Sequence, residues 1–186
     1  TLTLSGNNTY TGGTLISSGT LVANDVNTLG TGDVTDNATL MLNTGGDFIN
    51  NIGGTGRVEK SGDDTLTLSG ANSYSGGTLI SGGTLVANDV NALGTGDVTD
   101  NAALMLNTGG DFTNNIGGTG RVEKSGDDAL TLSGSNTYTG GTLISGGTLV
   151  ANDVNALGTG DVTDNATLAL NTGGDFDNAI SGSGKV

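Results

Sequence analysis

Paired carboxylates are the residues of this 186-residue chain whose types and spacing most readily suggest chemistry. Asp33 and Asp36 lie three positions apart, and Asp63 is followed directly by Asp64. Two carboxyl groups held at a suitable separation can act as the acid and base of a glycosidase. The same pairs recur as Asp97/Asp100, Asp127/Asp128 and Asp161/Asp164. Because a catalytic site normally occurs once in a chain, this repetition favours solvated acids at corners and loops over an active site.

A glycine-rich segment just before Asp33 suggests calcium. Gly30-Thr31-Gly32-Asp33 resembles half of the Gly-Gly-x-Gly-x-Asp nonapeptide that binds calcium in other repeat proteins. The other half is missing, and the segment does not recur every nine residues. We therefore expect no dedicated calcium site, although the net charge of -14 favours weak, non-specific binding of divalent cations.

Composition excludes most other chemistry. The chain has no Cys, His or Trp, so it cannot build a thiolate nucleophile, a zinc finger or a Ser-His-Asp triad. Five basic residues against 19 acidic ones argue against nucleic acid or anionic lipid as a partner. No apolar run approaches the roughly 18 residues needed to span a bilayer. We predict no enzyme, cofactor or metal, with no catalytic, cofactor-binding or metal-binding residue; the sequence does not identify partner-binding residues.

Short alternating runs of apolar and polar residues predict the elements that position these side chains. Leu2-Thr3-Leu4, Leu40-Met41-Leu42 and Leu66-Thr67-Leu68 alternate with period two and are bounded by Gly, Asn or Ser. This pattern is typical of half-buried strands. No stretch has an apolar period of 3.6 residues, so we expect an all-β fold with almost no helix.

A 64-residue repeat sets the predicted architecture. Thr-Leu-Thr-Leu-Ser-Gly begins at Thr1 and again at Thr65, and Ala-Leu-Thr-Leu-Ser-Gly begins at Ala129. The repeat units are residues 1–64, 65–128 and a truncated 129–186, with seven differences between the first two. Each unit is too poor in apolar residues to bury a core alone, so we expect one continuous structure in which units stack.

Apolar anchors divide each unit into turns. Leu85, Leu104, Val122 and Leu149 follow one another at two short intervals and then a longer one. This spacing predicts a parallel β-helix with about three turns per unit, two near 20 residues and one longer. About nine turns at roughly 4.8 Å each would form a rod about 40 Å long.

Asparagine and aromatic residues recur at fixed places in the units. Two interpretations stay open for the asparagines that end strands: amide ladders along the axis, or tolerance of left-handed backbone at corners. The aromatic residues recur once per unit, which favours packing in the core over ligand stacking. The asparagines are Asn24, Asn43, Asn88, Asn107, Asn152 and Asn171; the aromatic residues are Tyr10, Tyr74, Tyr138, Phe48, Phe112 and Phe176.

Three segments resemble a known family. Leu2 to Asn24, Leu66 to Asn88 and Leu130 to Asn152 each combine an LTLSG strand, an N-T/S-Y-T/S-G-G-T loop and a GTLVAN strand. They resemble the autotransporter-associated β-strand repeat, also called the passenger-associated transport repeat. The resemblance implies a right-handed parallel β-helix from the passenger of a Gram-negative autotransporter, displayed at the cell surface from the outer membrane. Many such passengers are adhesins or associate with one another, and the repeat is linked to passenger export.

The expected function is adhesion. We expect this segment to bind a host cell-surface or extracellular-matrix protein, such as fibronectin, with the same face presented several times along the rod. Weak contacts repeated in this way gain strength through effective concentration. Self-association between cells is one alternative, and a structural spacer or export aid without binding of its own is another. We expect neither a nucleic-acid partner nor membrane insertion by this segment.

Overall fold

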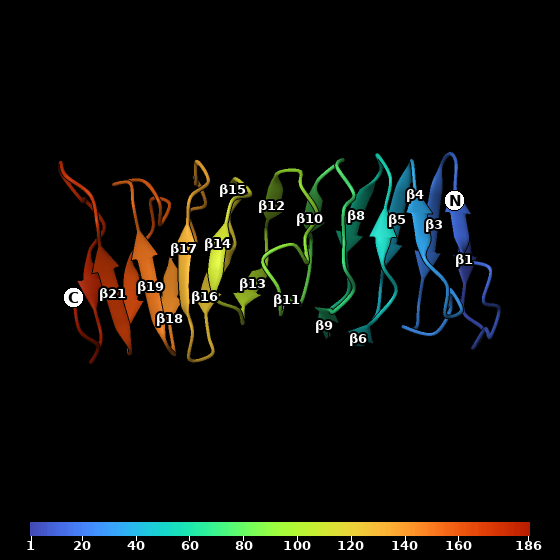
Figure 1. Cartoon of the computed structure of the whole chain (residues 1–186), viewed down its shortest axis with the longest axis horizontal. Coiled ribbons are helices and arrows are strands. Elements are labelled where there is room, and N and C mark those ends of the chain that lie inside the picture. The colour runs from blue at the N-terminus through green and yellow to red at the C-terminus, as the bar shows by residue number, and fades with distance from the viewer.

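The computed structural model describes residues 1–186 as an elongated coil of 22 short strands without a helix (Figure 1). Successive strands run around one long axis, and the two ends of the chain lie at opposite ends of the rod. No helix is present that could cross a membrane.

The strands form three faces. The first face is one seven-stranded sheet: β1 (Leu2–Leu4), β3 (Thr20–Ala23), β5 (Thr39–Leu42), β8 (Arg57–Lys60), β10 (Thr78–Ile80), β12 (Val98–Asp100) and β15 (Ile116–Gly117). The second face is one eight-stranded sheet: β6 (Gly46–Phe48), β9 (Thr65–Leu68), β11 (Thr84–Ala87), β13 (Ala103–Leu106), β16 (Arg121–Lys124), β18 (Thr142–Ile144), β20 (Val162–Asp164) and β22 (Ile180–Ser181). The third face holds two shorter sheets: β2 (Thr14–Ile16), β4 (Val34–Asp36) and β7 (Ile52–Gly53); then β14 (Gly110–Phe112), β17 (Ala129–Leu132), β19 (Thr148–Ala151) and β21 (Thr167–Leu170).

Every strand pair is parallel, and the pairing fixes the length of a turn. On the first face Leu2 pairs with Leu21, Leu21 with Leu40, and Leu40 with Val58. The column continues from Val58 to Thr78 and then to Val98, so the turns are nearly equal in length. The prediction of an all-β parallel solenoid with about nine turns is confirmed. Its right-handed sense stays a prediction.

The predicted longer turn is wrong. Val122 of β16 pairs with Thr142 of β18, which completes a turn of ordinary length. Leu149 lies in β19 on another face, where it pairs with Leu130 of β17. The strand that begins each repeat, such as β17, therefore does not lengthen a turn; it occupies the next face of the coil.

Equivalent strands of the three repeats consequently lie on different faces. Strands β1, β9 and β17 have the same place in the repeat, yet they belong to the first, second and third face in that order. One repeat makes three turns and one further face. The expectation that neighbouring repeats present the same face is therefore wrong, because the repeat is not a whole number of turns.

A buried asparagine continues the third face beyond β7. Between β7 and β14 the chain has no strand on this face, and Asn72 takes its place. The Asn72 side chain accepts a hydrogen bond from Ile52 N (2.8 Å) and donates one to Ala92 O (2.7 Å), so it connects the turns below and above. Asn136 does the same between Ile116 N and Ala156 O.

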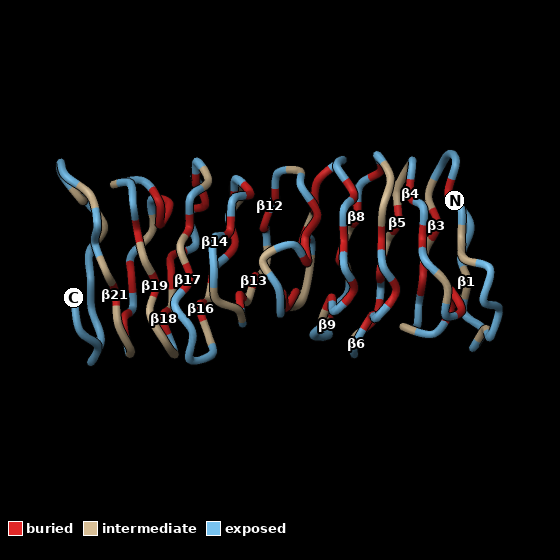
Figure 2. Tube along the Cα trace, in the orientation of Figure 1, coloured by how far each residue is buried: buried red, intermediate tan, exposed pale blue.

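The core is continuous along the rod. Inward residues such as Leu40, Val58 and Leu104 are almost completely buried and belong to one cluster of 34 residues. In Figure 2 the buried positions recur from turn to turn, except in the last turn at the C-terminal end. Each Å² of apolar surface that is removed from water contributes about 25 cal/mol of stability. The stack of turns buries more of this surface than a single repeat could bury alone, so stacking stabilises the rod.

The aromatic residues pack as predicted for a core in five of six cases. Tyr74, Tyr138, Phe48 and Phe112 are fully buried, and Phe176 packs against the core from a half-buried position. Tyr10, in the first turn, is 39% exposed. Each tyrosine hydroxyl lies 2.7–2.8 Å from a threonine hydroxyl four residues further along, namely Thr14, Thr78 and Thr142.

The corner asparagines form short amide ladders. Asn43 Nδ2 donates to Asn24 Oδ1 at 3.1 Å, and the corresponding pairs 88/107 and 152/171 do so at 3.0 Å. No residue other than glycine has a positive φ. Of the two interpretations left open, the ladder is confirmed and the left-handed corner is wrong.

A recurring surface hollow as candidate functional site

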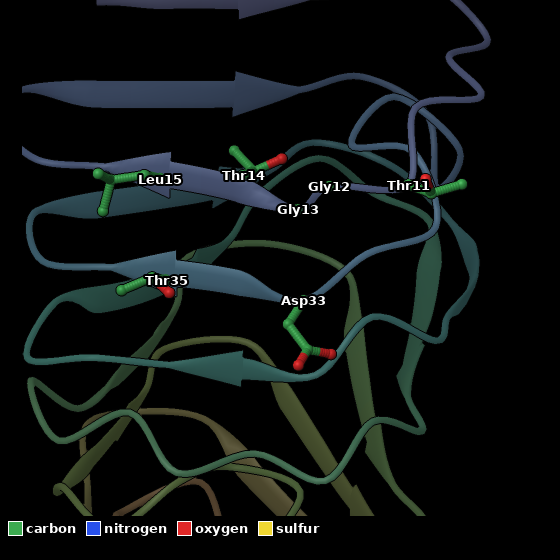
Figure 3. Close-up of a pocket in the computed structure, with 7 residues that line it drawn as sticks. All are labelled: Thr11, Gly12, Gly13, Thr14, Leu15, Asp33 and Thr35. Atoms are coloured by element: carbon green, nitrogen blue, oxygen red, sulfur yellow. The ribbon is translucent and has the colours of Figure 1, made fainter.

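A shallow hollow opens on the third face in the first repeat (Figure 3). Its lining comes from adjacent turns, with β2 and β4 supplying one side. Leu15 points outward and is 69% exposed, and the Thr35 side chain stands beside it on β4. The lining residues are Thr11, Gly12, Gly13, Thr14, Leu15, Asp33 and Thr35.

Close backbone approach explains why the hollow has a bare floor. A Cβ atom on Gly32 would lie 2.4 Å from Gly13 N, and one on Gly13 would lie 2.6 Å from Asp33 O. Gly13 also has a φ of +85°, which favours glycine. Since side chains are excluded from this corner, backbone and threonine hydroxyl groups form the surface.

The hollow recurs two repeats later. Thr139, Gly141, Asp161 and Thr163 occupy the positions of Thr11, Gly13, Asp33 and Thr35, and Arg121 from the turn below joins the lining. This copy lies on the eight-stranded second face, along β16, β18 and β20. The corresponding residues of the second repeat, including Leu79 and Thr99, lie on the seven-stranded first face.

The acid at the edge of the hollow has an amide partner in the first two repeats but not in the third. Asn51 Nδ2 donates to Asp33 Oδ1 at 3.0 Å, and Asn115 donates to Asp97 at 2.9 Å. In the third copy Ala179 replaces this asparagine, so Asp161 lacks the amide partner. Each hollow thus combines hydroxyl groups with one carboxylate, and can contact a partner through polar and charge-assisted hydrogen bonds.

The predicted acid pairs do not face a common site. Asp33 is exposed, whereas Asp36 is buried and accepts a hydrogen bond from Ala38 N at 2.9 Å. The second oxygen of Asp36 has no hydrogen-bond partner. Burial raises the pKa of Asp36, and it raises the pKa of the equivalent Asp100 to about 6. The expectation of solvated acids is therefore wrong for Asp36 and Asp100, which are structural acids of the core, and holds for the surface acid Asp33.

The Asp63/Asp64 corner contains residues that the sequence analysis missed. Lys60 is fully buried, and its ammonium donates hydrogen bonds to Ser61 O (2.6 Å) and Gly62 O (2.9 Å). It lies in the same inward column as Asp100, two turns away. Burial lowers the pKa of Lys60, which the neighbouring acids partly offset. Lys124 repeats the arrangement with the carbonyls of residues 125 and 126. The signal was available, since Lys60 follows Val58 at the inward spacing of two.

The other acids singled out in the sequence lie at corners of the coil. Asp63 and Asp64 are both exposed at their corner. The segment from Gly30 to Asp33 contributes Asp33 to the hollow and no second acid. The structure contains no group of three or more acidic, His or Cys side chains that could hold a metal ion.

A comparison with protein families decides what this repeat is. Residues 1–23, 58–87 and 122–151 match the passenger-associated-transport-repeat family. The chain carries three passenger-associated transport repeats, the repeat of autotransporter passengers. In the passenger the second and third matches begin on β8 and β16, so they include the strand with the buried lysine, upstream of the predicted signature. No curated protein and no solved structure matches the chain.

This repeat family is indicative of display at the cell surface from the outer membrane. The family signature also has a physical explanation in the structure. Its asparagine, Asn72 or Asn136, replaces a missing strand, its tyrosine fills the core, and its glycines leave the bare corner of the hollow.

Proposed function

We propose that this passenger segment is part of an adhesin, and that it binds a protein of the host surface or extracellular matrix, such as fibronectin. The recurrence of the hollow carries this proposal. The same outward combination of hydroxyl groups, backbone and a carboxylate is present in the first and third repeats. Shallow polar surfaces of this kind suit weak contacts, whose strength comes from their number.

The negative charge of the rod favours a partner with a basic surface. Lys60 and Lys124 are buried, so Arg57, Arg121 and Lys185 are the basic side chains left at the surface, against a large excess of acids. Such a surface attracts basic protein segments and repels nucleic acid. Arg57 and Arg121 pair with Glu59 and Glu123 at 3.4 Å, which leaves little free positive charge for an acidic partner.

Filling the hollows tests adhesion. Thr35, Thr99 and Thr163 are exposed strand residues, where an aromatic side chain is compatible with the sheet. We expect the triple variant Thr35→Trp/Thr99→Trp/Thr163→Trp to bind immobilised fibronectin or another matrix protein at least about tenfold more weakly than the wild type. Thr67→Trp, at an outward position away from the hollows, is the matched control. Equal binding by the triple variant and the control would refute the proposed site.

Self-association between cells is a second candidate. The outward column Val22, Met41, Glu59 and Leu79 gives the first face a partly apolar strip on an otherwise acidic rod. Two rods could approach along such strips with less repulsion than elsewhere. Analytical ultracentrifugation should then detect concentration-dependent dimers, and a monomer at all concentrations would exclude this function.

A shaft without binding of its own is the third candidate. Its support is the continuous core, which lets one repeat extend the next without a hinge. We also propose that the segment is not an enzyme, because the acid pairs recur with the scaffold and the pairs of the Asp33/Asp36 type divide between surface and core. Unchanged adhesion of a passenger with all three hollows filled would favour the shaft.

A further inference from the structure

The screw relation between repeats determines how many hollows one partner can reach. Thr35, Thr99 and Thr163 occupy the same place in successive repeats, but they lie on β4, β12 and β20. These strands belong to the third, first and second face respectively. The place that holds the hollow in the first and third repeats therefore moves to the next face with each repeat, about a third of the way around the rod.

The axial spacing follows from the same count. Three turns and one face correspond to a rise of about 16 Å per repeat, at roughly 4.8 Å per turn. Three repeats make about ten turns, so the same face returns after roughly 48 Å. A folded domain of about 100 residues has a radius of gyration of about 13 Å, and it cannot cover two hollows on different faces of the rod.

We propose that the passenger is a three-sided binding rod, on which each repeat holds a separate partner domain and a flat partner surface meets only every third repeat. This inference rests on the proposed adhesion through the hollows. Avidity toward a flat, rigid surface then requires repeats that are three apart. Small basic domains in solution can instead occupy neighbouring repeats independently, one on each face.

The absence of native cysteine allows a direct test in the full chain. Thr35→Cys/Thr99→Cys places two thiols in equivalent hollows, about 16 Å apart along the axis. Thr3→Cys/Thr99→Cys is the matched control, because Thr3, Val22, Met41, Glu59, Leu79 and Thr99 form one outward column on the first face. The control thiols are five turns apart, about 24 Å.

Each variant is coupled to biotin through a short maleimide linker and bound to monovalent avidin packed densely on a planar surface. We expect the hollow pair to dissociate within twofold of the single variant Thr99→Cys, since only one biotin can face the surface at a time. The control pair should dissociate at least tenfold more slowly. Dissociation of the hollow pair as slowly as the control would overturn the inference, as would a control pair that dissociates as fast as the single variant.

This experiment uses biotin and avidin, so its result does not depend on the natural partner. A failure of adhesion would appear instead as equal binding of the Trp variants to matrix proteins. The two failures are therefore distinguishable.

Discussion

Two sets of asparagines link neighbouring turns of the rod, and they differ in their surroundings. Asn43 lies exposed at a corner, where its amide donates to Asn24 on the turn below. Asn72 is 6% exposed and is the sole link between Ile52 N and Ala92 O on its face. Water can replace the bonds of the first amide but not those of the second, because a buried polar group left unpaired keeps its full desolvation penalty.

Replacing the buried amide should have the largest effect. Asn72→Ala leaves one backbone N–H and one carbonyl without partners, at about 1–3 kcal/mol each. We expect the free energy of unfolding to fall by about 2–6 kcal/mol, measured by chemical denaturation and circular dichroism. Asn136→Ala should match it, since Asn136 has the same two contacts. A loss below about 1 kcal/mol would contradict the comparison, because that is the value of an exposed hydrogen bond.

The same contrast between buried and exposed groups applies to Asp100 and Asp97. Burial raises the pKa of Asp100 from 3.8 to about 6, so between these values the folded chain binds more protons than the unfolded chain. Stability should therefore decrease as pH rises from about 4 to 6, by up to about 3 kcal/mol for this group, since one pKa unit corresponds to about 1.4 kcal/mol.

Asp100→Asn removes this titration and should flatten the pH dependence of the unfolding free energy. Asp97→Asn, at an exposed acid three residues earlier, is the matched control. Thermal melts across pH 4 to 7 make the measurement. Parallel pH profiles for Asp100→Asn and the wild type would show that the buried carboxyl does not titrate in this range.

The smallest expected effect is at the exposed ladder. Asn43→Ala should lower the free energy of unfolding by less than about 1 kcal/mol, because water solvates the groups it leaves. The equivalent variants Asn107→Ala and Asn171→Ala should behave alike in the same denaturation assay. A cost as large as that of Asn72→Ala would remove the distinction between the two sets.

The sequence predicted those features that depend on alternation. Leu40-Met41-Leu42 and its relatives specify strands and the inward face, so the all-β solenoid and its number of turns followed. The Asn24/Asn43 ladder was one of the two interpretations left open, because both residues end strands. The core position of Tyr74 and Phe48 followed from their single occurrence per unit.

Other features depend on where the turns meet, which alternation does not encode. Val122 can be followed on its face by Thr142 or by Leu149, and only pairing between turns distinguishes the shorter step from the longer one. With the longer step, equivalent strands of successive repeats would lie on one face, so their rotation around the rod was not predicted. The hollow was missed for the same reason, since it needs Gly13 and Gly32 from adjacent turns to approach closely. Asn72 has no strand around it that would indicate its role.

The fractional number of turns per repeat also has a genetic consequence. Repeats that differ at seven of 64 positions are good substrates for unequal recombination, which adds or deletes whole units. Such an event keeps the core intact, because equivalent strands stack equally well on any face. Loss of one unit nonetheless shortens the rod by about 16 Å and swings everything beyond it through about a third of a revolution. Variation in copy number would thus re-aim the distal part of the passenger without changing a single residue of it, and only losses or gains in threes would restore the original direction.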